Sequence, residues 1–163
     1  MGVRTTGDPV RDFMLQGLDG KSWSSADARR RGLLLFAIYK KGCGTCRFTL
    51  PFLQRFHEEY AGEGFRLWGV AQDSAEETRE FAGQLGITFP LLLDRDLSVT
   101  GDYGLTHVPG IYVVDKSDTI LRHAPAFVKD ELNAMAQLVA ERCGVPYVRI
   151  IRPADDAPAM KPG

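Results

Sequence analysis

The stretch GLLLFAIYKKGCGTCRFTLPFL, residues 32–53, contains the features that decide the fold. It opens with a continuous apolar run, residues 32–39, which is typical of a strand buried on both faces of a sheet. Two cysteines, Cys43 and Cys46, follow with two small residues between them. Hydrophobic side chains then recur at helical spacing from Phe52 to Tyr60. The stretch therefore predicts a buried strand, a pair of thiols and a helix, in that order.

The segments on either side alternate between strand and helix patterns. Strands are expected within DFMLQGLDGKSWSS (12–25, two short strands), FRLWGVAQD (65–73), FPLLLD (89–94), GIYVVD (110–115) and TILRHA (119–124). Helices are expected within SSADARRR (24–31, capped by Ser24 or Ser25), SAEETREFAGQLGI (74–87, with Ser74 and Glu77 as a capping box), DLSVTGDYGL (96–105) and KDELNAMAQLVAERCG (129–144). This order predicts an α/β protein with a central mixed sheet, helices on both faces and an N-terminal strand hairpin.

The composition indicates one globular domain. With 163 residues, 44% of them hydrophobic and 25% charged, the chain is long enough to bury its own core. We expect a single domain over residues 1–146 and a loosely held, Pro- and Ala-rich C-terminal tail over residues 147–163. The net charge of −1 gives no bulk field that would attract nucleic acid or an anionic membrane, so neither is expected as a partner.

Targeting signals are not evident in the sequence. No run approaches the roughly 20 apolar residues of a membrane span, and the N-terminus has no apolar core of a signal peptide. We therefore expect a cytoplasmic protein, while a periplasmic protein whose signal or anchor has been removed would have the same sequence. Three cysteines, only two of them close together, suit a redox or metal pair with one further thiol rather than a disulfide framework.

The position of the thiols at a strand–helix junction suggests chemistry. A helix N-terminus offers free N–H groups and partial positive charge, which favour the thiolate form of Cys43 and make it the expected nucleophile. Cys46 lies one turn deeper, where it would be shielded and could resolve a mixed disulfide formed on Cys43. Lys40 and Lys41 would add positive potential if their side chains point toward Cys43. They would otherwise be two solvated loop lysines.

A zinc site is the first alternative for the two cysteines. Structural zinc usually needs a second C-x-x-C pair or a matching pair of histidines. The remaining candidate ligands are isolated in the sequence: Cys143, His57, His107 and His123. We therefore expect no metal and no other cofactor, and interpret Cys143 as a buried thiol of the last helix.

At this point the sequence resembles the thioredoxin-fold thiol–disulfide oxidoreductases. The branch it is most similar to groups the reductases of cytochrome c maturation with the alkyl hydroperoxide reductase and thiol-specific antioxidant proteins. The resemblance covers roughly residues 9 to 143. It depends on the C-x-x-C after an apolar strand, on Pro51, and on a Val-Pro pair before a strand that ends in Asp. It implies a thioredoxin-like three-layer fold and a redox-active dithiol.

The Val-Pro pair is the second anchor of the resemblance. In the family this proline is cis and packs against the dithiol, and the backbone of the preceding residue pairs with the substrate. The resemblance thus implies that Pro109 lines the site and that Val108 offers its backbone to substrate. Without the resemblance a trans proline would be the ordinary expectation, since only about 5% of X-Pro bonds in folded proteins are cis.

The sequence departs from the family pattern around the cysteines. The usual tryptophan before the first cysteine is Gly42, which leaves that face more open, and the usual residue before the second cysteine is replaced by Thr45. The acid that assists the resolving cysteine in the family is absent, since Ala37 and Thr49 occupy its two alternative positions. That absence leaves the deprotonation of Cys46 without an obvious base.

A further departure lies before the proline, where His107 replaces the usual glycine. Histidine can accept and donate protons near neutral pH. We hypothesise that His107 lies at the rim of the dithiol and assists proton transfer or partner contact. The alternative is a solvated loop histidine.

Three functions remain open from the sequence. The first is a thiol–disulfide oxidoreductase that acts on protein or small-molecule disulfides and is recharged by an upstream thiol reductant. The second is a peroxidase with the pattern P-x-x-x-[ST]-x-x-C, but neither Cys43 nor Cys46 has the required Pro and Thr upstream. The third is a non-enzymatic redox-sensing or binding module. Residue types do not set the redox potential, so the direction of electron flow is left open.

Overall fold

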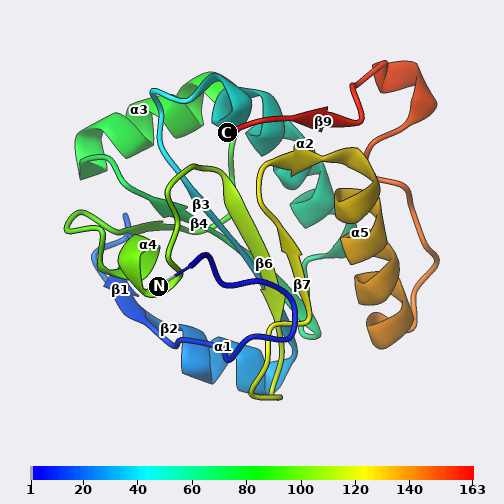
Figure 1. Cartoon of the computed structure of the whole chain (residues 1–163), viewed down its shortest axis with the longest axis horizontal. Helices are drawn as coiled ribbons and strands as arrows, with labels where there is room; N and C mark the ends of the chain where they lie inside the picture. The colour runs from blue at the N-terminus through cyan, green and yellow to red at the C-terminus, as the bar shows by residue number, and fades with distance from the viewer. Residues whose placement is uncertain (1) are drawn as a thin grey trace.

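The computed structural model describes residues 2–163, and a five-stranded mixed sheet runs through its centre (Figure 1). The strand order is β5-β4-β3-β6-β7. Strands β3, β4 and β5 are parallel to one another, β6 is antiparallel to β3, and β7 is antiparallel to β6. The strands are β3 (Leu33–Tyr39), β4 (Phe65–Ala71), β5 (Leu91–Leu93), β6 (Gly110–Val114) and β7 (Arg122–Ala124). Every residue of β3 is buried, as the uninterrupted apolar run predicts for the central strand.

Helices cover both faces of this sheet, which confirms the predicted three-layer architecture. They are α1 (Ser25–Arg31), α2 (Gly44–Tyr60), α3 (Ala75–Leu85), α4 (Ser98–Asp102) and α5 (Lys129–Cys143). On one face α2 packs with α3 and α5, and the Phe56 ring of α2 stacks on Phe65 of β4. On the other face Phe36 of β3 meets Tyr103, directly after α4, with ring centroids 5.3 Å apart.

An N-terminal hairpin completes the second face. Its strands, β1 (Met14–Gln16) and β2 (Ser22–Ser24), pair antiparallel as predicted. Phe13 lies edge-on to Phe36 at 5.2 Å, and Trp23 lies edge-on to Trp68 of β4 at 5.5 Å. These aromatic contacts hold the hairpin on the sheet, because edge-to-face pairs add to the free energy of apolar burial.

The helix ends are set by the capping residues that the sequence predicts. Ser24 caps α1 by accepting the N–H of Asp27 at 3.2 Å, and Ser74 caps α3 by accepting the N–H of Glu77 at 3.1 Å. At the C-terminal end of α5, Gly144 has a φ of 66°. That left-handed conformation suits glycine and stops the helix there.

The chain after α5 folds back onto the domain, so the expectation of a loosely held tail is wrong. Ile150 and Ile151 are each only 1% exposed, and their N–H groups donate to the side-chain oxygen of Asn133 on α5. The chain continues through a short 3-10 helix, η1 (Pro153–Asp155). The burial of these two isoleucine side chains and their hydrogen bonds to the Asn133 side chain hold this Pro- and Ala-rich segment against α5.

The same segment ends in a strand that the sequence did not predict. Strand β9 (Met160–Lys161) pairs antiparallel with β8 (Phe127–Val128), just before α5. In Figure 1 this last strand passes beside α2 and ends near the start of that helix. We call residues 152–163 the returning segment.

Candidate active site

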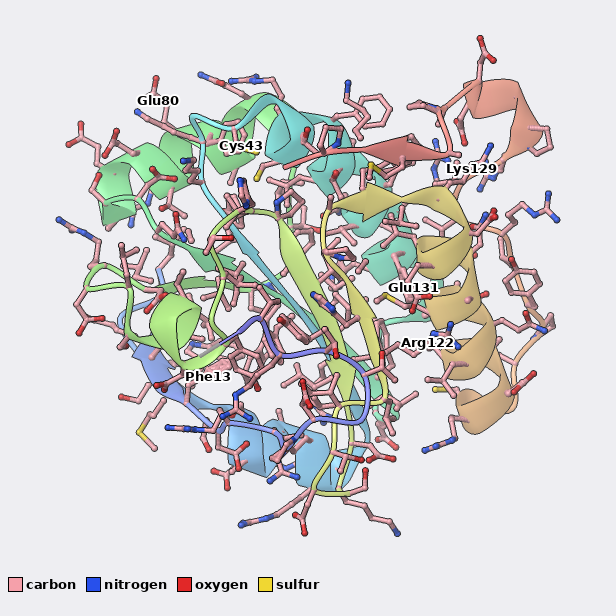
Figure 2. All side chains as sticks on the ribbon, in the orientation of Figure 1. Phe13, Cys43, Glu80, Arg122, Lys129 and Glu131 are labelled. Carbon is pink, nitrogen blue, oxygen red and sulfur yellow. The ribbon has the colours of Figure 1, made fainter. Side chains whose placement is uncertain are left out.

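The two thiols lie where β3 ends and α2 begins, near the upper edge of the molecule in Figure 2. Cys43 is the N-cap of α2, and its Sγ accepts the backbone N–H of Cys46 at 3.1 Å. A sulfur in this position takes up one of the free N–H groups of the helix and feels the positive end of its dipole. This is the geometry expected for a nucleophilic Cys43.

The second thiol is shielded, again as expected. Cys46 is 0% exposed, whereas Cys43 is partly exposed. Burial, and then the adjacent sulfur of Cys43, raise the pKa of the Cys46 thiol well above its ordinary value. The environment therefore keeps Cys46 protonated while Cys43 is the sulfur that a ligand can reach.

A loop opposite the thiols supplies the second wall of the site. The Val108–Pro109 peptide bond is cis, as the resemblance implies. The thiol of Cys43 donates to the carbonyl oxygen of Val108 at 3.3 Å. Cys43 and Val108 thus come together from positions more than 60 residues apart in the chain, while Pro109 follows Val108 and is not among the residues that line the cavity beside Cys43.

A cavity of about 500 Å³ opens at this place. Its lining residues come from the α2 start, the loop before the cis proline and the returning segment: Lys40, Gly42, Cys43, Gly44, Thr45, Thr106, His107, Val108, Lys161, Pro162 and Gly163. Cys46 is absent from this lining, in keeping with its burial. No Asp or Glu side chain is among these eleven residues.

His107 and Thr45 both line the cavity. His107 is exposed, and its Nδ1 lies 2.9 Å from the hydroxyl of Thr106. Thr45 is only 9% exposed, and its hydroxyl donates to the carbonyl oxygen of Pro162 at 2.5 Å. The expected role of Thr45 beside the cysteines therefore includes a contact with the returning segment that the sequence did not indicate.

Lys41 does not reach the cavity. Its ammonium pairs with the carboxylate of Glu77, which lies on α3, and its backbone N–H donates to Asp73. The lysine that lines the cavity is its neighbour Lys40. The positive potential expected from Lys41 is thus compensated by a carboxylate, because the loop directs its side chain toward the N-terminus of α3.

The other departures from the family pattern can be read directly from the packing. A Cβ placed on Gly42 would meet no atom within 4 Å, so this side of the dithiol is open, as expected. Ala37 is fully buried, and the hydroxyl of Thr49 donates to the carbonyl oxygen of Thr45 at 2.7 Å. Neither position supplies an acid to Cys46.

The sequence did not predict that three residues of the returning segment would line the cavity. Lys161, Pro162 and Gly163 line the cavity from a stretch rich in Pro and Ala. They follow a stretch in which Ile150 and Ile151 are buried. The only hint in the sequence was that pair of adjacent isoleucines.

Among residues 2–163, no three His, Cys, Asp or Glu side chains lie together in a group that could hold a metal ion. None of the helices described in this part of the chain is long and apolar enough to cross a membrane.

The fold and the paired thiols define a thioredoxin-fold oxidoreductase. Comparison with protein families agrees, since the AhpC/TSA family matches residues 6–123. The chain belongs to this family.

Individual proteins are similar over most of the chain. It is 28% identical to the thioredoxin-like protein YneN of Bacillus subtilis (81% of this chain, 79% of that protein). It is 26% identical to the thiol-disulfide oxidoreductase ResA of Geobacillus thermodenitrificans (70% of this chain, 66% of that protein). The fold also matches the solution structure of a putative protein disulfide isomerase from Bacteroides thetaiotaomicron, with a TM-score of 0.77 and 23% identity over 87% of this chain and 94% of that one.

Proposed function

We propose that the protein is a thiol–disulfide oxidoreductase that works through Cys43 and Cys46. The observation that carries the proposal is the contrast between the two sulfurs. Cys43 faces a cavity and accepts a helix N–H, while Cys46 is buried with a raised pKa. The name of the relative ResA, a thiol-disulfide oxidoreductase, supports the same activity.

The reaction transfers two electrons from the dithiol to a disulfide. The Cys43 thiolate attacks one sulfur of the substrate, forms a mixed disulfide and releases the other substrate sulfur as a thiolate. Cys46 then loses its proton and attacks Cys43, which releases the second thiol and leaves a Cys43–Cys46 disulfide. The two protons of the dithiol end on the two released thiols, and an upstream thiol reductant restores the pair.

The deprotonation of Cys46 is the demanding step, because burial raises its pKa and no Asp or Glu side chain lines the cavity. His107 lines the same cavity as Cys43, and an imidazole can accept and donate a proton. We therefore assign His107 to proton transfer at the rim of the site. We assign Val108 and Pro109 to contact with the substrate. Thr45 and Gly42 are assigned to shaping the opening of the cavity at Cys43.

The expected partners are disulfides together with an upstream thiol reductant. A cytoplasmic location stays a prediction that follows from the sequence alone. The peroxidase alternative has little support, because the threonine that would hydrogen-bond peroxide is replaced by Cys43 or Lys40 in the two possible registers.

A turnover assay tests this function. The reduced protein should reduce a disulfide such as 5,5′-dithiobis(2-nitrobenzoate) repeatedly when dithiothreitol is supplied, and should not consume hydrogen peroxide at a comparable rate. Cys143→Ser is the control for the third thiol and should retain the activity. Peroxide consumption that exceeds disulfide reduction would favour the peroxidase. Binding without turnover would favour a redox-sensing module.

A further inference from the structure

The returning segment lies beside Thr45 and Val108, at the cavity that Cys43 also lines. Thr45 holds the carbonyl oxygen of Pro162, and Lys161 is fixed by strand pairing with Phe127. A Cβ placed on Gly163 would lie 2.4 Å from the carbonyl oxygen of Val108, the same oxygen that accepts the Cys43 thiol. Residues 161–163 therefore occupy the space directly beside Val108 and Cys43.

This placement limits what can approach Cys43. A disulfide within a polypeptide has backbone on both sides of each cysteine, and one extended strand beside another needs about 4.8 Å of free space. The returning segment fills that space along Val108. What remains is a cavity of about 500 Å³, a size typical of small-molecule sites.

From these observations we propose that the site takes small disulfides, and that residues 161–163 exclude polypeptide disulfides. This inference rests on the proposed disulfide reduction and specifies its substrate class. With glutathione disulfide as the probe, Cys43 attacks one sulfur and one glutathione leaves. Attack by Cys46 on Cys43 releases the second, so that two glutathione molecules and one protein disulfide are formed.

The first test compares two substrates in two chains. The full chain should reduce glutathione disulfide with a rate constant at least about tenfold above that for insulin disulfides, whose access needs displacement of the segment. Deletion of residues 160–163 should raise the rate constant for insulin about tenfold and change that for glutathione disulfide by less than about threefold. Met14→Ala, at an exposed position outside the returning segment, is the control that should leave both values unchanged.

A second pair of variants covers the case in which the deletion disturbs folding. Thr45→Val removes the hydroxyl that holds Pro162 and should speed insulin reduction about fivefold, a factor that corresponds to the loss of one hydrogen bond. Thr45→Ser keeps the hydroxyl and should restore the original ratio of the two rate constants. An unchanged ratio in both Thr45→Val and the deletion variant would overturn the steric role. Failure of the full chain and the deletion variant to reduce any disulfide would instead refute the proposed function.

Discussion

At the scale of single residues, the two cysteines differ because one helix turn separates solvent from core. Cys43 caps α2, accepts the N–H of Cys46 and lines the cavity, so both its surroundings and its access suit an attacking sulfur. Cys46 lies inside, among residues that raise the pKa of its thiol. The spacing of the pair predicted this division, because a helix that starts at the first cysteine carries the second inward.

Alkylation rates test this difference. Iodoacetamide at pH 7 should label Cys43 first, because its sulfur is reachable and contacts a helix N–H. Cys46 should react more than about tenfold more slowly, since it is buried and protonated. Cys143, whose pKa is raised by partial burial, should fall between them. Peptide mapping by mass spectrometry gives the three rates, and faster labelling of Cys46 than of Cys43 would contradict the assignment.

The pH dependence of turnover tests His107. His107→Ala should lower the rate of disulfide reduction about tenfold and change the shape of the pH–rate profile, if the imidazole carries the proton. His107→Gln keeps a polar side chain of similar size without the titration, and should behave like the alanine variant. If both variants retain the original profile, the histidine has no part in proton transfer.

At the scale of elements, the returning segment is the part of the fold that the sequence did not predict. Strands and helices of the central sheet could be predicted because each has its own periodicity or capping residues. Strands β8 and β9 have only two residues each, so the surrounding structure must position them. The chain before β9 is held on α5 by the hydrogen bonds of Ile150 and Ile151 to Asn133, and these residues meet only after the chain has folded.

The anchor between Arg55 and Asp155 makes the docking of this segment pH-dependent. Arg55 of α2 donates to both carboxylate oxygens, at 2.8 and 3.2 Å, and thereby holds the pKa of Asp155 below its ordinary value. A carboxyl group with a lowered pKa stabilises the fold above its unfolded pKa of about 4. That stabilisation is lost as the pH falls through the lowered folded value.

Asp155→Asn tests this anchor. The variant should be less stable than the original protein by about 1 kcal/mol at pH 7, since it loses a charge-assisted pair. The difference in the free energy of unfolding should vanish near pH 2, where both proteins are neutral at this position. Asp156→Asn, an exposed neighbour, is the matched control. Urea titration at the two pH values measures the effect, and a difference that persists in acid would contradict it.

At the scale of the whole molecule, most of the fold follows from patterning. The apolar run of β3 fixed the central strand, and the alternation of strands and helices predicted the layers. The site was less predictable, because it joins the α2 start, the cis-proline loop and the returning segment from distant parts of the chain. Cys43 and Val108 could be paired only through the family resemblance, and Gly163 had no signal at all.

The aromatic cluster around Phe36 tests the account of the core. Its ring lies 5.2 to 5.4 Å from those of Phe13, Tyr103 and Tyr112, and so joins the hairpin, β3, β6 and the end of α4. Phe36→Ala should therefore cost about 3 to 5 kcal/mol of unfolding free energy. Met14→Ala, at an exposed position, should change it by less than about 0.5 kcal/mol. A loss below about 1 kcal/mol in Phe36→Ala would show that the cluster does not hold these elements together.

The central claim, that Cys43 attacks and Cys46 resolves, has one direct measurement. Each protein is reduced, exposed to excess glutathione disulfide, freed of the reagent and weighed intact by mass spectrometry, in a Cys143→Ser background. Cys46→Ser should carry one glutathione on Cys43, because the mixed disulfide has no resolving thiol. Cys43→Ser should carry almost none, and the parent should form the Cys43–Cys46 disulfide. A stable adduct on Cys46 in the Cys43→Ser protein, with none on Cys43 in Cys46→Ser, would reverse the roles and contradict the account.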